Sequence, residues 1–175
     1  DLDTRRGQEA TPLMVDGVIY VSTAWSKVKA FSAKSGEPLW SYDPQVDGQW
    51  AVNACCDVVN RGVAVWEGKV FVGTIDGRMI AINAATGTKV WEADTLISRD
   101  LSYSITGAPR IIKGKVVIGN GGAEYGVRGW LEALDIKTVK RRWRTYTIPG
   151  PGEAGHETWK DKHGAWKTGG GSTWV

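Results

Sequence analysis

The chain contains two cysteines, and they are neighbours in the sequence, Cys55 and Cys56. Adjacent Cα atoms lie about 3.8 Å apart across a trans peptide, less than the roughly 4.4–6.8 Å that disulfides usually span. A bridge between these residues would therefore form a small ring with a distorted peptide. Such a ring closes no useful chain loop, so its role would be a rigid, polarisable surface in an oxidising compartment. The alternative is a pair of buried free thiols, and the two residues alone leave both open.

The elements that must position these cysteines form a repeat of about fifty residues. Three stretches align: VKAFSAKSGEPLW, MIAINAATGTKVW and LEALDIKTVKRRW, which end at Trp40, Trp91 and Trp143. The intervals between these tryptophans are 51 and 52 residues. A turn glycine and a β-branched or aromatic segment precede each stretch, in residues 15–21, 66–72 and 112–118. Two hairpin-like elements per repeat predict a stacked or radial β architecture.

Each repeat has two predicted turns. The first turn carries a glycine where two residues must reverse an antiparallel pair, at Gly17, Gly68 and Gly114. The second turn carries Gly36 in the first repeat and Gly87 in the second, where a positive φ is required. Val139 occupies this place in the third repeat, so the sequence predicts a different turn there.

The predicted fold class is all-β. Ten tryptophans and 23 glycines against two phenylalanines and two methionines fit short strands joined by tight turns, with large flat residues between them. Radial repetition of four-stranded sheets makes a β-propeller, and we expect the three repeated tryptophans to pack between successive sheets. About three sheets are too few to close a ring. The sequence therefore predicts a fragment of a longer propeller.

Two insertions interrupt the repeat. The spacing from the first turn glycine to the alanine of the aligned stretch is 13 residues in the first two repeats and 19 in the third, where six extra residues lie within GNGGAEYGVRG. The connection after Trp40 is longer than the one after Trp91, and it holds ACCDVVNRG. Insertions on one scaffold tend to share a binding face. A lone Glu124 in a glycine-rich loop would be a solvated acid, but its place in an insertion favours a functional role.

Composition excludes several other functions. The net charge is +3, and its one basic cluster, at residues 140–144, is interpreted as a solvated strand edge, so no nucleic-acid partner is expected. No apolar run reaches the length of a membrane span, and no signal-like segment is present. Zinc is disfavoured because adjacent cysteines cannot both ligate one ion comfortably and no CxxC or HxxxH pattern occurs.

Five motifs in order resemble the methanol and ethanol family of pyrroloquinoline quinone (PQQ) dependent alcohol dehydrogenases. They are RGQEATP at 6–12, ACCDVVNRG at 54–62, TGAP at 106–109, GNGGAEYGVRG at 119–129 and GGGSTW at 169–174. The resemblance covers the whole chain and implies roughly the first third of an eight-bladed propeller with tryptophan-docking motifs. It implies that residues 1–175 are a partial PQQ-binding domain, incomplete at both ends, of a periplasmic enzyme.

The resemblance implies a flat tricyclic quinone held between a vicinal disulfide ring, matched by Cys55 and Cys56, and a coplanar indole, matched by Trp174. Arg61 matches the residue that pairs with a cofactor carboxylate, a task that suits its planar, charged fork. Thr106 matches a hydroxyl donor to the same edge. One further match is an acidic residue that contacts the ring system, Glu9.

The GGAE motif matches the remaining cofactor contacts and a metal ligand. Gly121, Gly122 and Ala123 match cofactor-binding positions, although the family often has serine where this chain has Gly121, which offers only its backbone N–H. Glu124 matches a carboxylate ligand of Ca²⁺ or a lanthanide, a hard cation that acts as a Lewis acid. The general base, an aspartate, and the other metal ligands are expected downstream. The chain alone is therefore predicted to have no catalytic residue and no activity.

The activity implied by the resemblance is oxidation of a primary alcohol to an aldehyde by hydride transfer to PQQ. Electrons would pass to a cytochrome c or a quinone, and the parent enzyme would form a homodimer or a complex with a small subunit. Two alternatives are a non-catalytic propeller scaffold and a sugar-oxidising quinoprotein. The scaffold needs no adjacent cysteines, GGAE insertion or GGG-Trp motif, and the sugar enzyme is expected to lack the cysteine pair.

Overall fold

The computed structural model describes residues 1–160 and 163–173, and these form three four-stranded antiparallel sheets. The strands of the first sheet are β1 (Leu13–Val15), β2 (Val18–Ser22), β3 (Val28–Ser32) and β4 (Pro38–Tyr42). Those of the second are β5 (Ala64–Trp66), β6 (Lys69–Gly73), β7 (Arg78–Asn83) and β8 (Lys89–Asp94). Those of the third are β9 (Arg110–Ile112), β10 (Lys115–Gly119), β11 (Trp130–Asp135) and β12 (Arg141–Tyr146).

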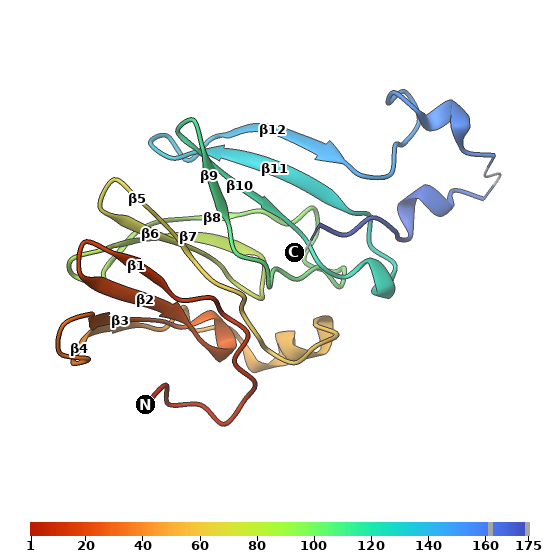
Figure 1. Ribbon diagram of the computed structural model, residues 1–175. Helices are drawn as coiled ribbons and strands as arrows, with labels where there is room; N and C mark the ends of the chain where they lie inside the picture. Colours follow the sequence, from red (N-terminus) through yellow and green to blue (C-terminus); the bar gives the residue numbers. More distant parts are fainter. Residues whose placement is uncertain (161–162, 174–175) are drawn as a thin grey trace.

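The three sheets fan out, with β1 beside β5 and β5 beside β9 (Figure 1). The first hairpin turns lie at one end of the sheets. The chain segments that contain the two insertions, with 3₁₀ turns at Gly48–Asn53 and Ala123–Tyr125, lie at the opposite end (Figure 1). This arrangement confirms the prediction of an all-β, radial repeat whose insertions share one face. None of the helices within the described residues has the length and apolar character needed to span a membrane.

The first hairpin turns share one geometry. Each joins its strands through two residues that both have positive φ, the arrangement of a type I′ turn, whose twist matches the strands. The pairs are Asp16 (48°) with Gly17 (78°), Glu67 (44°) with Gly68 (69°) and Lys113 (47°) with Gly114 (72°). The three glycines therefore occupy the turns predicted for them.

The second turn of the third repeat contradicts the sequence prediction. Val139 has φ 63°, close to the 76° of Gly36 and the 72° of Gly87. Its N–H donates to the Asp135 carbonyl at 2.9 Å, as the N–H of Gly87 donates to the Asn83 carbonyl at 2.9 Å. The turn is thus the same, and a β-branched residue is held in the left-handed region by the hydrogen bonds around it.

Alternation along the strands divides the core between two junctions. Ile80 and Ile82 of β7 belong to the cluster with Tyr20 and Val28 of the first sheet. Met79 and Ala81, which point to the other side of β7, belong to the cluster with Val116, Ile118 and Trp130 of the third sheet. A strand buried on both faces has no polar side. The middle sheet is therefore covered by a neighbour on each face.

The repeated tryptophans occupy equivalent places. They pair with Ala30, Ala81 and Ala133, and each pairing is followed by a register irregularity. Trp40 packs between the first and second sheets and Trp91 between the second and third, as predicted. Trp143 is 40% exposed, and no further sheet packs on it within residues 1–160 and 163–173.

The basic cluster near β12 is not uniformly solvated. Arg144 is only 10% exposed at its side chain and pairs with the buried carboxylate of Glu132, with an N–O distance of 2.7 Å. Its guanidinium also donates to the Thr95 carbonyl and lies 4.6 Å from the Trp130 ring. The interpretation of residues 140–144 as a solvated edge is therefore wrong for Arg144, because the alternation of the strand turns this residue inward.

Candidate functional site

The cysteine pair lies at the end of a short 3₁₀ segment. The carboxylate of Asp47 accepts a hydrogen bond from the Gln49 N–H at 2.9 Å and caps the 3₁₀ turn Gly48–Asn53. The two residues that follow Ala54 are Cys55 and Cys56, both free and exposed, with their Sγ atoms 2.8 Å apart. The alternative of two buried thiols is therefore wrong. The vicinal disulfide remains a proposal.

Arg61 is held by a buried asparagine on one side and a threonine on the other. The Asn60 amide donates to the Gly73 carbonyl at 2.8 Å, and its Oδ1 accepts from the Gly62 N–H at 3.1 Å. The backbone N–H of Arg61 donates to the Thr106 carbonyl at 2.8 Å, and its Nη1 donates to the Thr106 Oγ1 at 2.6 Å. These bonds fix the direction in which the guanidinium points.

Glu9 joins this group through an ion pair. Its Oε2 lies 2.8 Å from Nη2 of Arg61. The arginine thus bridges the N-terminal segment and residues 104–106. Three residues predicted for one edge of a cofactor, Glu9, Arg61 and Thr106, are therefore connected in the structure.

The second insertion is shaped by a buried asparagine and a glycine. The Asn120 amide donates to the Gly121 carbonyl at 2.9 Å, and its Oδ1 accepts from the Trp130 N–H at 2.7 Å. Gly122 has φ 101°, and a Cβ there would lie 2.2 Å from the Ser102 carbonyl oxygen, so this position requires glycine. The 3₁₀ turn that follows, Ala123–Tyr125, presents Glu124.

One predicted cofactor contact is already used within the chain. The N–H of Gly121 donates to the Ser104 carbonyl at 2.7 Å. A glycine has no other donor, so this N–H is engaged within the chain in the described structure, and its contact with a cofactor carboxylate stays a prediction. Gly121 lines the site but offers no free N–H there.

Glu124 and Cys55 form a polar pair across the two insertions. Partial desolvation, the neighbouring Cys56 thiol and the Glu124 carboxylate together raise the pKa of the Cys55 thiol to about 12. The hydrogen bond from Cys55 holds the pKa of Glu124 below its ordinary value. Cys55 is therefore a neutral donor near neutral pH, and Glu124 is an ionised acceptor. Among the described residues, no group of three or more His, Cys, Asp or Glu side chains is arranged so that it could hold a metal ion.

The two insertions converge on one pocket. Its lining comprises Ala54, Cys55, Cys56, Arg61, Ser104, Thr106, Gly121, Gly122 and Glu124. The pocket volume is about 10 Å³, room for one water molecule, so these residues by themselves enclose no space for a larger ligand. Of the predicted site residues, Ala123 lies in the adjoining turn, and Trp174 lies outside the described residues.

Several residues at this site are not among the predicted site residues. Ser104 and Ala54 line the pocket, while the buried Asn60 and Asn120 each precede a pocket residue and anchor its backbone. The two asparagines lie inside quoted motifs, but no role was predicted for them. Their burial, which shows that they position the backbone rather than face solvent, is visible only in the fold.

The glycine run at 169–171 brings the backbone close to the second insertion. A Cβ on Gly129 would lie 2.1 Å from the Gly171 carbonyl oxygen, so two chain segments meet there without side chains. Beyond this contact, the Thr173 N–H donates to the Asn120 carbonyl at 2.9 Å. The run therefore places residue 173 beside Asn120.

Comparisons with known proteins agree with this geometry. The family model for the glucose/ethanol/alcohol dehydrogenase β-propeller domain, named PQQ, matches residues 2–175. The 1-butanol dehydrogenase (cytochrome c) of Thauera butanivorans is 60% identical over 153 residues, which are 87% of this chain and 22% of that protein.

Two solved structures are also similar. The quinohemoprotein alcohol dehydrogenase ADHIIG of Pseudomonas putida HK5 superposes with a TM-score of 0.93 at 51% identity, over 98% of this chain and 26% of that one. A europium-containing methanol dehydrogenase gives a TM-score of 0.85 at 37% identity, over 99% of this chain and 33% of that one. The chain thus spans about a quarter of the curated relatives that it matches, with shares of 22% and 26%.

Proposed function

This chain belongs to the PQQ-dependent glucose/ethanol/alcohol dehydrogenase β-propeller family, and we propose that it forms one wall of the cofactor site of a quinoprotein alcohol dehydrogenase. The proposed reaction is oxidation of a primary alcohol to an aldehyde. The observation that carries the proposal is the convergence of both insertions, which brings the cysteine pair, Arg61, Thr106 and Glu124 to a single pocket.

The chemistry of this wall fits a flat polycarboxylate. The guanidinium of Arg61 and the hydroxyl of Thr106 lie 2.6 Å apart and form a donor group at one edge, which suits a carboxylate. The exposed sulfur atoms of Cys55 and Cys56 supply a polarisable surface beside it. We propose that Trp174 covers the opposite face of the cofactor. When bound, PQQ supplies the hydride acceptor.

Glu124 is the residue of this chain that we propose as a ligand of Ca²⁺ or a lanthanide. Its lowered pKa keeps the carboxylate ionised, and hard cations prefer oxygen ligands. A single carboxylate does not make a site, so further oxygen ligands must come from outside the described residues. The similar methanol dehydrogenase that contains europium supports a metal of this class.

The remaining proposals concern the whole protein. We propose that residues 1–175 are part of a PQQ-binding propeller that is incomplete at both ends of this chain, and that the protein acts in the periplasm. The name of the Thauera relative supports a cytochrome c acceptor. A quinone acceptor, a homodimer and a small-subunit complex remain alternatives for the complete protein. The 175-residue chain alone is expected to show no alcohol oxidation.

The test is alcohol-dependent dye reduction by the complete polypeptide that contains this chain, reconstituted with PQQ and Ca²⁺ or a lanthanide. We expect oxidation of 1-butanol and loss of most activity in Arg61→Gln and Glu124→Gln. Glu67→Gln, in a hairpin turn at the other end of the sheets, is the matched control. Turnover of glucose but not of primary alcohols would favour the sugar-oxidising alternative. A folded protein that binds no PQQ would contradict the proposal.

A further inference from the structure

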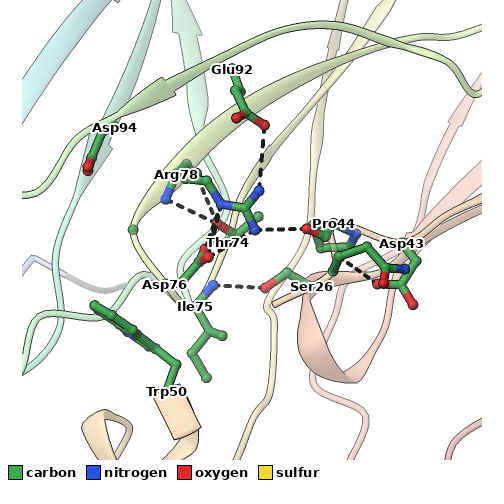
Figure 2. A network of polar contacts seen from close by, with 12 residues as sticks. Ser26, Asp43, Pro44, Trp50, Thr74, Ile75, Asp76, Arg78, Glu92 and Asp94 are labelled. Atoms are coloured by element: carbon green, nitrogen blue, oxygen red, sulfur yellow. Dashed lines mark hydrogen bonds and ion pairs between the residues drawn. The ribbon is translucent and has the colours of Figure 1, made fainter. Parts of the chain in front are cut away.

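A polar network joins the segment before the cysteines to the second sheet (Figure 2). Arg78 of β7 donates through Nε to both carboxylate oxygens of Asp76, at 3.1 and 2.9 Å. Its Nη2 donates to the Pro44 carbonyl at 2.8 Å, and its Nη1 lies 3.5 Å from Glu92. Arg78 therefore holds the chain where it leaves β4 against the second sheet.

Trp50 lies to one side of this network, near Ile75 (Figure 2). It belongs to the capped 3₁₀ turn Gly48–Asn53, and its ring packs with the buried residues Val58 and Ile75. The guanidinium of Arg99 lies 5.6 Å from the ring centroid. Arg99 is itself held, because it pairs with Asp94 at 2.8 Å and donates to the Asp76 carbonyl at 3.3 Å. The indole is therefore fixed on several sides.

The indole N–H of Trp50 donates to the Tyr103 carbonyl at 3.1 Å. Tyr103 is 1% exposed, and its hydroxyl donates to the Arg128 carbonyl at 3.0 Å, so this acceptor belongs to a rigid segment. The next residue, Ser104, lines the pocket and accepts the Gly121 N–H through its carbonyl. One hydrogen bond thus links the turn that precedes the cysteines to the strand-like segment that carries Ser104 and Thr106.

We propose that Trp50 is a positioning residue, which fixes the cysteine wall of the pocket, residues 54–56, relative to the opposite wall, residues 104–106. The inference rests on the proposed function in that this pocket is taken to be part of the surface that binds PQQ. Trp50 itself does not line the pocket. It acts through the 3₁₀ turn, whose last residue lies two positions before Cys55, so loss of its N–H donor loosens the spacing between the walls without removing any pocket side chain.

The test uses the complete polypeptide and the variant Trp50→Phe, which keeps an aromatic ring below Arg99 but removes the N–H donor. Loss of a hydrogen bond to a buried carbonyl is worth about 1–2 kcal/mol, so we expect PQQ binding in the presence of Ca²⁺, followed by absorbance, to weaken about 5- to 30-fold. Trp66→Phe is the matched control. Trp66 is 47% exposed at the end of β5 and lies away from the pocket.

A second measurement needs no cofactor. In glutathione buffers, oxidised glutathione and the two cysteine thiols exchange to give the Cys55–Cys56 disulfide and two molecules of reduced glutathione. One disulfide breaks, one forms, and the two thiol protons pass to the glutathione sulfurs. A looser cysteine wall lowers the effective concentration of one thiol at the other. We therefore expect Trp50→Phe to shift this equilibrium severalfold toward the dithiol, whereas Trp66→Phe leaves it unchanged.

Arg99→Gln is a milder variant that leaves the indole N–H in place and removes the cation near the ring, with an expected effect of about two- to fivefold on both measurements. It replaces Trp50→Phe should that variant not fold. Unchanged PQQ binding and an unchanged thiol equilibrium in a folded Trp50→Phe protein would overturn the inference. A shifted thiol equilibrium in a protein that binds no PQQ, with or without the substitution, would uphold the positioning role and refute the proposed function.

Discussion

The junction between the first and second sheets and the junction between the second and third sheets come from the same repeat. The tryptophan in each junction makes different contacts. In the first junction, the Trp40 indole N–H donates to the Ala84 carbonyl at 2.9 Å. The ring lies on Gly87, where an added Cβ would be 2.8 Å from the indole. Glycine is suited to this position for two reasons. It adopts the left-handed backbone conformation of the turn without strain, and it leaves room for the tryptophan ring.

Among the described residues of the second junction, the tryptophan does not make this hydrogen bond, and a valine takes the place of the glycine. Trp91 is the equivalent of Trp40, and Val139 is the equivalent of Gly87. Within the part of the chain that the structure describes, the Trp91 Nε1 is buried and has no hydrogen-bond acceptor. The turn is the same and Val139 has a side chain where Gly87 has none, so we infer that this side chain prevents the hydrogen bond in the second junction.

A hydrogen bond from an arginine side chain to a backbone carbonyl is present in both junctions. The arginine lies on a different strand in each. Arg78 of β7 donates to the Pro44 carbonyl at 2.8 Å, and Arg144 of β12 donates to the Thr95 carbonyl. Pro44 and Thr95 are equivalent residues, 51 positions apart. The two arginines are not equivalent, because the third-sheet equivalent of Arg78 is Trp130. The repeat therefore preserves the backbone acceptor, while the donor can come from either of two neighbouring strands.

The largest expected effect comes from breaking the arginine contact in the second junction. Arg144→Met leaves the 1% exposed Glu132 carboxylate without its nearest cation, and we expect a loss of about 3–5 kcal/mol in the free energy of unfolding by urea. Arg78→Met should cost less, because Asp76 and Glu92 are 12% and 38% exposed at their side chains. Equal losses would contradict the comparison, and Glu132→Leu combined with Arg144→Met should recover most of the stability.

The same substitution has an expected pH dependence. Burial raises the pKa of Glu132 above its ordinary value, while Arg144 opposes that rise. Without Arg144 the pKa rises further, so the folded state binds a proton more tightly than the unfolded state does. Stability from this proton is present at low pH and is lost as pH rises through the raised pKa. The cost of Arg144→Met should therefore shrink as the urea titrations move from about pH 7 to about pH 5.

Gly87→Ala tests the docking position of the first junction. The residue has φ 72°, and its new Cβ would lie 2.8 Å from the Trp40 indole, so we expect a loss of about 2–3 kcal/mol in urea unfolding. Gly36→Ala is the control, since Gly36 has φ 76° but no atom within 4 Å of an added Cβ. A similar cost for both variants would show that the backbone conformation, and not the tryptophan, sets the requirement for glycine.

Replacing the two tryptophans by phenylalanine separates packing from hydrogen bonding. Trp40→Phe loses ring volume and leaves the Ala84 carbonyl without its indole donor. Trp91→Phe loses the same volume but removes an N–H that has no acceptor among the described residues. We expect Trp40→Phe to be more destabilising by about 1–2 kcal/mol. The prediction fails if Trp91→Phe costs as much.

The smallest expected effect has the opposite sign. Val139→Gly relieves a β-branched residue with φ 63°, although glycine also gains freedom in the unfolded chain, so we expect a net stabilisation of about 1 kcal/mol. It should also leave room for the Trp91 ring to pack on this turn as the Trp40 ring packs on Gly87. Combining it with Trp91→Phe should abolish part of the gain, which a double-mutant cycle measures. Destabilisation by Val139→Gly would refute our account of the second junction.

Periodic features of the fold were predictable from the sequence. The spacing of Trp40, Trp91 and Trp143 and the first turn glycines predicts three equivalent sheets, and the structure has them in register. The exceptions are positions where tertiary contacts override local preference. Val139 keeps a glycine-type turn because the surrounding hydrogen bonds hold it, and Arg144, which the strand alternation turns inward, is paired there with Glu132 on the neighbouring strand.

Much of the site was predictable because most of its residues lie in the two segments that break the repeat, and Thr106 lies in a further motif, TGAP at 106–109. The cysteine pair, Arg61, Thr106 and Glu124 were all expected, and they meet in one pocket. The residues that support them were not expected. Asn60 lies in a motif and Trp50 does not, but neither has a periodicity that shows its role, which depends on an acceptor 13 residues away for Asn60 and 53 residues away for Trp50.

By itself, the sequence determined the sheet repeat, the positions of the two insertions and the residue types that they contain. Each of these follows from local spacing and residue type. Only the tertiary structure decided which groups are free to act. It assigns the Gly121 N–H to the Ser104 carbonyl and sets the Cys55 thiol beside Glu124. The physical reason is that a hydrogen bond needs a partner in space, and these partners come from segments whose separation along the chain carries no signal.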